Sequence, residues 1–415
     1  IKSGIGLNAK LNNRSIFDRN NYFYQDLPQG YQISQFKDPI VGEGSVEIEI
    51  EGTTKTIGIE RLHLEQDAGK SLHDQDPNLT FVDLNRSGIA LMEIVSKPDM
   101  SSSDEAIAYV RKVRSILRYL DTCDGNMEQG SLRADVNVSV RKKGEELGTR
   151  CEIKNLNSFK HIGAAINFEV DRQIKIIESG DQVKQETRLY EVVSNKTRSM
   201  RSKEDAHDYR YFPDPDLLPL QLEQEWIEKI KKSLPELPDE KKLRFINFYK
   251  ISGYDAEVLT SDRRISEFFE EVAKNRSSKL SVSWVASELF AVLNKLNLNI
   301  ENSPVSSSQL GELIDEIENG TISNRAAKEV FEEMCNSEKS AKDIIEEKGL
   351  VQISDTSEIE IFINKVLEDN PENVEKYKNG KTKLLGFFIG EVMKATKGKA
   401  NPGLLNQIVK KKLDN

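Results

Sequence analysis

The sequence lacks several features that mark whole classes of protein. It has three cysteines in 415 residues, Cys123, Cys151 and Cys335, which are far apart and without Cys-x-x-Cys spacing. This argues against a disulfide framework and against a cysteine zinc site. No apolar run approaches the roughly 20 residues that span a bilayer, and no signal-peptide pattern opens the chain. We therefore expect a soluble protein without membrane contact, in the cytoplasm or, in a eukaryote, in an organellar matrix.

An excess of positive charge is also lacking. The formal net charge is −10 at pH 7, and charged residues make up 31% of the chain. This balance excludes a protein that coats nucleic acid by bulk positive charge, so any polyanion must meet a local patch. The length predicts several domains at roughly 100–200 residues each. Because the chain starts at Ile1 rather than Met, we expect that residues before Ile1 are missing.

Apolar and polar side chains alternate with a period of two through about residues 45–155, which predicts antiparallel sheet. Within this region the apolar parity switches from Ile57 and Ile59 to Leu62. A β-bulge near Glu60–Arg61 would produce that switch.

Helical patterns interrupt and then replace the sheet. Residues 101–120 combine serine N-caps, early acidic residues and an apolar stripe, which predicts a helix lying on the sheet. After the proline-rich segment YRYFPDPDLLPL the periodicity is helical to the end. We expect an α+β fold with an antiparallel-sheet domain over 1–220, a helical domain over 221–349 and a small helical tail over 350–415.

Two strands of the sheet region have chemically active faces. In RLHLEQDAGK the side chains of His63, Glu65 and Asp67 share one face by period two, and Lys70 follows. Carboxylates beside an imidazole and an amine suit Mg²⁺ and phosphate oxygens; the alternative is a solvated strand face. In GIALMEIVS, Glu93 is either buried and answered by a cation, or at a sheet edge facing water.

A predicted hairpin, in which KKGEEL forms the turn, has a third polar face. A symmetric turn places Glu152 opposite Asn137 and Lys154 opposite Asp135. With Glu128 just before the hairpin, this face suits a nucleotide or an acyl phosphate, although charge pairs on a wet sheet explain the same residues. The face comprises Arg133, Asp135, Asn137, Arg150, Glu152 and Lys154.

Two further segments suggest nucleic-acid chemistry. The stretch SMRSKEDAHDYRYFPDPD contains Arg210 between Tyr209 and Tyr211, which suits phosphates and stacked bases; a loop pinned by its own aromatics is the alternative. In the last 36 residues eight lysines face only two acidic residues, which predicts a patch for a phosphate backbone; a lysine-rich soluble helix pair is the alternative. These lysines are Lys381, Lys383, Lys394, Lys397, Lys399, Lys410, Lys411 and Lys412.

Six motifs occur in the order found in the B subunits of aspartyl/glutamyl-tRNA amidotransferases, and the chain closely resembles that family over essentially its whole length. The motifs are FDRNNYFYQDLPQGYQISQ, RLHLEQDAGK, VDLNRSGIALMEIVSKPD, MEQGSLRADVNVS, EIKNLNSFK and SMRSKEDAHDYRYFPDPD, and the closing MKATKGKANPGLLNQIVKKKL continues the resemblance.

The resemblance implies a carbon–nitrogen ligase that uses ATP and Mg²⁺ to phosphorylate the side-chain carboxylate of Glu on tRNA(Gln) or Asp on tRNA(Asn). Ammonia, made from glutamine by an amidase, the A subunit, then displaces phosphate, while a small C subunit clamps the other two together. In keeping with this division, no Ser-Ser-Lys or Cys-His glutaminase constellation occurs in the chain. The resemblance also implies a catalytic cradle domain and a YqeY-like tail.

Carried over by motif, Glu65 and Glu93 match the family's metal-binding carboxylates. Taken with the polar faces above, this assigns three sets of residues. Catalysis is assigned to Glu65, Glu93, Lys70, Glu128 and Glu152. Nucleotide binding is assigned to Arg133, Asn137, Arg150, Lys154 and Arg210. Binding to the body of the tRNA is assigned to Lys394, Lys397, Lys399, Lys410, Lys411 and Lys412.

The sequence departs from the family pattern at two places. The family begins with a further segment containing Glu-x-His, which supplies additional metal ligands, and nothing here matches it, so we expect an incomplete metal shell. Lysines common along the family's ammonia route are replaced by Asn20 and Gln29, which favours a polar lining without a charged gate. The rival hypothesis is a non-catalytic tRNA-binding adaptor. Composition does not distinguish Glu-tRNA(Gln) from Asp-tRNA(Asn), whose carboxylates differ by one methylene.

Overall fold

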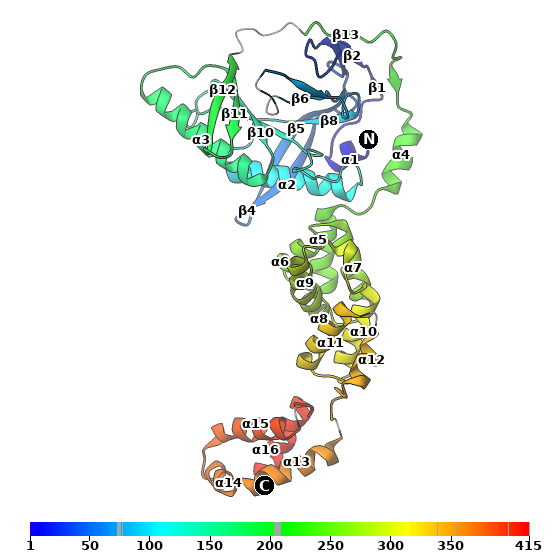
Figure 1. Cartoon of the computed structure of the whole chain (residues 1–415), viewed down its shortest axis with the longest axis vertical. Coiled ribbons are helices and arrows are strands. Elements are labelled where there is room, and N and C mark those ends of the chain that lie inside the picture. The colour runs from blue at the N-terminus through cyan, green and yellow to red at the C-terminus, as the bar shows by residue number, and fades with distance from the viewer. Residues whose placement is uncertain are drawn as a thin grey trace. The chain divides into compact units, whose positions relative to one another are not determined.

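The computed structural model describes residues 1–72, 76, 78–202, 209–337, 339–353, 355–396 and 398–414. By internal contacts the chain divides into two compact units, Ile1–Pro238 and Asp239–Asn415. The first unit contains the named strands, β1 to β14, and the second is helical (Figure 1).

The first sheet has the order β4-β5-β8 and is antiparallel throughout. Strands β4 (Gly44–Ile50) and β5 (Thr53–Gln66) are joined by a tight turn in which Glu51 and Gly52 both have positive φ. The register of β5 against β8 (Ala90–Ser96) shifts between Ile59 and Arg61, which confirms the predicted β-bulge.

Helix α2 (Ser103–Tyr119) covers this sheet, as predicted. It begins at Ser102, whose side chain accepts a hydrogen bond from the backbone N–H of Glu105. Its apolar stripe packs on the inward side chains of β4 and β5 in one core, and Figure 1 shows the helix beside these strands. The core includes Val46, Ile48, Ile57, Ile59, Val113, Ile116 and Leu117.

The second sheet has the order β12-β11-β10-β9. Three of its strands are β9 (Ala134–Val138), β10 (Cys151–Leu156) and β11 (Glu186–Glu191). Strands β10 and β11 are parallel, because helix α3 (Phe159–Glu178) crosses between them and returns the chain to the same end. The other pairs, including β11 with β12 (Lys196–Ser202), are antiparallel.

Smaller elements complete the first unit. Strands β13-β2-β3 form a three-stranded sheet, and β1-β14 and β6-β7 form two-stranded ribbons. Their bounds, with those of the remaining helices, are α1 Lys2–Gly6, β1 Arg14–Ser15, β2 Asp18–Asn21, β3 Tyr31–Ser34, β6 Lys70–Leu72, β7 Phe81–Asp83, β13 Phe212–Pro213, β14 Leu220–Gln221 and α4 Gln224–Ser233.

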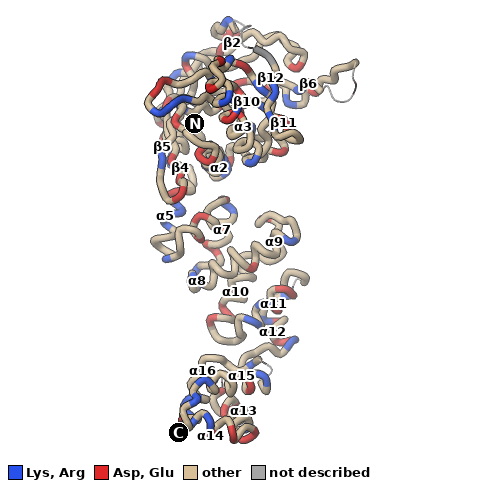
Figure 2. The backbone as a smooth tube through the Cα atoms, turned by 90° about the vertical axis from the view of Figure 1, so that its left-hand side faces the viewer, with Lys and Arg blue, Asp and Glu red and all other residues tan. Residues whose placement is uncertain are grey.

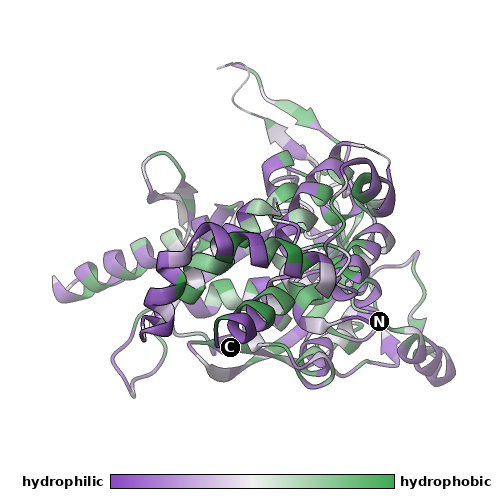
Figure 3. Cartoon of the chain, turned by 90° about the horizontal axis from the view of Figure 1, so that it is seen from below, coloured by the Kyte–Doolittle hydropathy of each residue, from purple (hydrophilic) through white to green (hydrophobic). Residues whose placement is uncertain are grey.

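In the second unit, amphipathic helices enclose two apolar cores, one over residues 245–345 and one over residues 359–413. Figure 3 shows apolar and polar stripes along the helices. None of the described helices combines the length and apolarity needed to cross a membrane. The helices are α5 Pro238–Tyr249, α6 Gly253–Leu259, α7 Arg263–Val272, α8 Ser278–Val282, η2 Ser283–Leu289, α9 Phe290–Leu296, η3 Ile300–Asn302, α10 Ser307–Glu318, α11 Asn324–Asn336, α12 Ala341–Glu347, α13 Thr356–Asp369, α14 Pro371–Lys378, η4 Thr382–Leu384, α15 Leu385–Ala395 and α16 Pro402–Asp414.

The predicted α+β class with mainly antiparallel sheets is confirmed. Helix α4 lies within the first unit, because Ile227 packs into the core under α2. The three-domain division, including a separate tail over 350–415, stays a prediction.

Candidate functional site

The β-bulge in β5 decides which side chains face the candidate site. Before the bulge the odd-numbered residues Ile57 and Ile59 point into the core and are fully buried. After it, Leu62 is the core residue and the odd-numbered positions lie on the opposite face. His63 and Glu65 therefore leave the apolar layer within the same strand that buries Ile59.

The register of β5 against β8 adds a third member to this face. His63 lies directly opposite Glu93. His63 Nε2 is 3.5 Å from Glu93 Oε2 and 3.6 Å from Glu65 Oε2, and one ligand atom from each of the three side chains lies within 4.8 Å of the others. An imidazole and two carboxylates from neighbouring strands thus converge on one point.

The three side chains differ in their exposure to water. The side chain of His63 is 6% exposed, that of Glu65 17% and that of Glu93 50%. Strand β8 is at the edge of its sheet, so Glu93 occupies the edge position that one alternative described, while its side chain is half-buried and lies near His63 as the other required. The cluster is therefore buried at His63 and open to solvent at Glu93, where a ligand can enter.

The electrostatics of the cluster favour a cation. Partial burial raises the pKa of Glu93, and repulsion from Glu65 adds to that rise, while His63 opposes it. His63 Nδ1 is buried without a hydrogen-bond partner among the described residues. The two carboxylates are the donors that the predicted Mg²⁺ prefers, whereas the imidazole of His63, which the family motif did not indicate, is more typical of transition-metal sites. The carboxylates therefore fit the predicted metal, and His63 lies beside them.

Asp67, predicted to share this face, has a different role. Arg86 Nε donates a hydrogen bond to Asp67 Oδ2 at 3.0 Å, and Arg86 Nη2 is 2.9 Å from the same oxygen. Arg133 Nη2 is 3.7 Å from Asp67 Oδ2. Arg86 also donates to the carbonyl of Gly130, so it ties β5 to the turn before β9. Sequence reasoning missed Arg86, although a buried aspartate such as Asp67 requires a cation nearby.

The polar hairpin face has the predicted pairing at Glu152, which is in register with Asn137. The register shifts after Ile153, and Lys154 meets Asp135 through its side chain, with Nζ 2.8 Å from the carboxylate. Burial alone lowers the pKa of Lys154, but Asp135 and Glu152 outweigh it and raise that pKa. Asp135 also acts electrostatically on Glu93, so the face of β9 and β10 adjoins the carboxylate cluster.

The segment after residue 208 also reaches the cluster. Burial raises the pKa of Tyr211, and the charges of Glu65 and Glu93 raise it further. The ring of Tyr211 stacks on Phe36 with centroids 4.4 Å apart, and Arg210 is exposed beside it. Of the basic residues in the motif before it, Lys203 and His207 lie outside the described residues.

The remaining predicted site residues are exposed side chains of the same unit. Lys70 begins the β6-β7 ribbon opposite Asp83, Glu128 lies in the turn before β9, and Arg150 precedes β10. Their assigned roles stay predictions.

Of the two positions that depart from the family pattern, Gln29 contacts Gln66, next to Glu65, and Asn20 is connected to Gln66 through Gln32. Gln29 Nε2 donates to Gln66 Oε1 at 2.7 Å, and Gln32, in register with Asn20, donates to the Gln66 carbonyl at 2.8 Å. Asn20 is 3% exposed, and its Oδ1 has no hydrogen-bond partner among the described residues. The amides of Gln29, Gln32 and Gln66 thus form a hydrogen-bonded group next to Glu65, and a polar lining without a charged gate stays a prediction.

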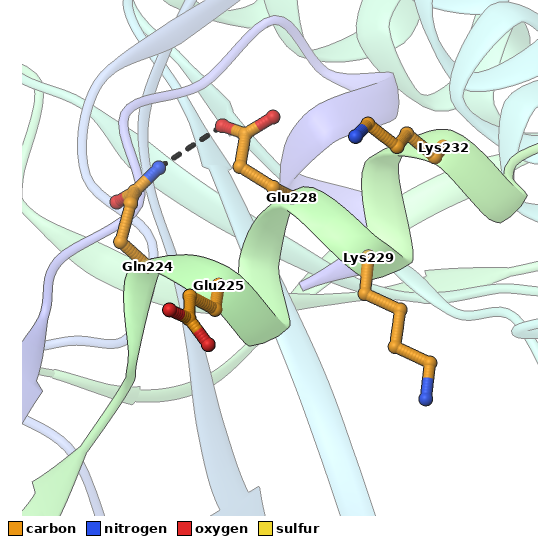
Figure 4. A pocket seen from close by; sticks show the side chains of 5 residues that line it. All are labelled: Gln224, Glu225, Glu228, Lys229 and Lys232. Carbon is orange, nitrogen blue, oxygen red and sulfur yellow. Dashed lines mark hydrogen bonds between the residues drawn. The ribbon is translucent and has the colours of Figure 1, made fainter.

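A separate hollow in the first unit lies along α4 (Figure 4). It is lined by Gln224, Glu225, Glu228, Lys229 and Lys232, with Gln224 donating to Glu228 at 3.0 Å. It contains none of the predicted site residues.

The tail lysines occupy one half of their segment. Residues 350–379 contain seven acidic residues and three lysines, so the excess of positive charge lies in the half with α15 and α16, where blue segments outnumber red ones (Figure 2). Lys394, Lys410 and Lys411 are exposed, and Lys399 is half-buried. Lys412 is held by Asn364 at 2.7 Å and Glu360 at 3.2 Å, while Lys397 lies outside the described residues.

Two sequence families together match most of the chain. Residues 1–228 match the GatB/GatE catalytic domain, and residues 267–413 match the GatB domain. The sheet unit with the carboxylate–imidazole cluster thus matches a class of catalytic domain, and the helical region that follows matches a second domain named for the same family.

Curated relatives cover the full chain. It is 60% identical to the B subunit of the aspartyl/glutamyl-tRNA(Asn/Gln) amidotransferase of Pelagibacter ubique, with 100% of this chain and 85% of the relative aligned. The same protein of Granulibacter bethesdensis is 58% identical (100% and 86%), and that of a Methylobacterium species is 59% identical (100% and 84%). The chain therefore belongs to the family of aspartyl/glutamyl-tRNA(Asn/Gln) amidotransferase B subunits, whose members are parts of a glutamine-dependent ligase.

Proposed function

We propose that this chain uses ATP and Mg²⁺ to phosphorylate the side-chain carboxylate of Glu-tRNA(Gln) or Asp-tRNA(Asn), and then amidates it. In the first step a carboxylate oxygen bonds to the γ-phosphorus of ATP as the bond to ADP breaks. In the second step ammonia bonds to the acyl carbon and phosphate leaves. The amidase (A) partner supplies the ammonia, the small C partner joins the amidase to this chain, and the heterotrimer works in the cytoplasm.

The observation that carries this proposal is the convergence of His63, Glu65 and Glu93 at the open edge of the first sheet. The two carboxylates would hold Mg²⁺, which when bound offsets the negative charge on the phosphate oxygens. The stacked Tyr211 and Phe36 shelter one side of the cluster.

The hairpin face supplies groups of the opposite sign. Lys154 stays protonated through its ion pair with Asp135, and Arg133 is 57% exposed beside Asp67. Both are cations next to an acidic centre, which suits the phosphates of a nucleotide. Gln29 and Gln32 both donate to Gln66, and Asn20 is in register with Gln32, so these amides would provide an uncharged approach for neutral ammonia.

The test is the substitution Glu93→Gln in the assembled heterotrimer. It keeps the shape and removes a charge, so ATP hydrolysis that depends on misacylated tRNA should fall roughly a hundredfold or more. Glutamine hydrolysis by the amidase partner should persist. Glu47→Gln is the matched control, because Glu47 is an exposed glutamate on β4 of the same sheet.

Two results would contradict the proposal. If Glu93→Gln leaves amide formation intact, Glu93 is a structural residue. If the complex shows no ATP hydrolysis that depends on misacylated tRNA, the chain is the non-catalytic adaptor instead.

A further inference from the structure

Arg61 shares the face of the cluster but is no part of the proposed metal shell. It follows the bulge in β5 directly, opposite Val95. Because the bulge reverses the parity of the strand, Arg61 lies on the same side as His63 and Glu65. Without the extra residue, the guanidinium would point with Ile59 toward the apolar core.

The guanidinium of Arg61 is only partly satisfied. Its Nη1 donates to Glu60, the preceding residue, at 2.9 Å. Its Nε is buried and has no hydrogen-bond partner among the described residues. A buried N–H without an acceptor is unfavourable, so this donor is available to an acceptor that the described part of the chain does not supply.

The charge of Arg61 acts on two side chains at the cluster. It lowers the pKa of Glu93 and of Tyr211, against the burial that raises both. Arg61 therefore lies within electrostatic reach of the Glu93 carboxylate, which would bind metal, and of the Tyr211 phenol. An arginine guanidinium group beside a metal centre is the arrangement that stabilises a transferring phosphoryl group.

We propose that Arg61 binds an oxygen of the phosphoryl group as it passes from ATP to the substrate carboxylate. This inference rests on the proposed function and adds one residue to it. The ligand is an oxyanion, and the carboxylate of the aminoacyl group is the competing source of the same chemistry. Because charge spreads over the phosphoryl oxygens in the transition state, the contact strengthens during transfer and should act mainly on kcat.

The experiment compares Arg61→Gln and Arg61→Lys in the assembled complex, with kcat and the KM values for ATP and aminoacyl-tRNA measured separately. Arg61→Gln should lower kcat roughly a hundredfold. Arg61→Lys should recover part of the loss, because it keeps the charge without the guanidinium group. Added guanidinium ion should partly restore Arg61→Ala, which a merely structural role would not show.

Arg198→Gln is the matched control, since Arg198 is also paired with a glutamate of its own unit, Glu191, and is 60% exposed on β12. It should leave all three kinetic parameters unchanged. If Arg61→Gln raises only the KM for aminoacyl-tRNA, the oxyanion is the substrate carboxylate and the proposal is wrong. Unchanged kinetics would also overturn it. If Glu93→Gln is inactive while Arg61→Gln is not, the proposed function stands and only the role of Arg61 fails.

Discussion

The first unit contains two clusters of ionisable side chains, one around Glu169 and one around Glu93. They differ in how far the protein itself provides hydrogen-bond donors and positive charge for the central carboxylate. Around Glu169 both carboxylate oxygens are satisfied by the protein: Arg172 donates at 2.6 and 3.0 Å, Gln173 at 2.8 Å and Thr197 at 3.2 Å. Around Glu93 the nearest cation-forming group is His63, with one nitrogen unpartnered among the residues that the structure describes.

The pKa values follow this difference. Burial alone would raise the pKa of Glu169, but the hydrogen bonds from Arg172 and Gln173 outweigh it and lower that pKa. Partial burial raises the pKa of Glu93, because its opposing partners are weaker. A carboxylate that the fold satisfies is a structural element, whereas one left short of positive charge requires a ligand.

The largest expected effect is a loss of stability when the cluster around Glu169 is disrupted. Glu169→Ala leaves Arg172 and Arg188 without their buried partner, so the free energy of unfolding of the first unit should fall by about 3–5 kcal/mol. Chemical denaturation measures this. Glu178→Ala, an exposed position at the end of the same helix, should change it by less than about 0.5 kcal/mol. Equal effects of the two substitutions would contradict the structural role of Glu169.

The next largest expected effect is a loss of activity with little loss of stability. Glu65→Gln should lower tRNA-dependent ATP hydrolysis roughly a hundredfold while changing the free energy of unfolding by less than about 1 kcal/mol. The reason is that Glu65 contributes charge to a centre without holding the fold together. Activity and thermal unfolding of the same preparation decide the matter. A stability loss matching that of Glu169→Ala would place Glu65 among the structural residues.

The pH dependence of stability should sharpen the comparison. Because the pKa of Glu169 is lowered in the folded state, its stabilisation is present above the unfolded pKa of about 4.3 and is lost as pH falls through the folded value. Glu169→Gln should therefore flatten the acid limb of the stability profile. Glu93, with a raised pKa, disfavours folding once ionised, so Glu93→Gln should be neutral or stabilising at pH 7. An acid limb that Glu169→Gln leaves unchanged, or a loss of stability at pH 7 in Glu93→Gln, would contradict this account.

The smallest effect concerns the lysines of α16. Replacing Lys410 and Lys411 by Gln should reduce the salt dependence of tRNA binding by about two in the logarithmic slope, with kcat unchanged. Lys376→Gln on the acidic half of the tail, where Lys376 adjoins Glu372, should leave the slope unchanged. A titration of tRNA at several salt concentrations measures both. If the slope stays the same in the double variant, α16 does not contact the phosphate backbone.

Local patterns sufficed to predict the bulge, helix α2, the facing of Glu152 and Asn137, and the alternation that puts His63 and Glu65 on one side. Each depends on residues within one strand, one helix or one hairpin. The pairing of Asp67 with Arg86 was missed, because the two are separated by a ribbon and a turn and no period connects them. The parallel pair β10 and β11 was missed for the same reason, since its register depends on the crossover through α3.

By itself the sequence determined which residues alternate, where parity switches and which motifs identify the family, because side-chain direction along a strand follows from the backbone geometry of neighbouring residues. Only the tertiary structure decided that His63 stands opposite Glu93, that β8 is an edge strand, and that Asp135 and Tyr211 adjoin the same carboxylates. These relations depend on which distant strands pair and in what register. That choice is made by the burial of whole faces against common cores, a property of the assembled chain that no single segment contains.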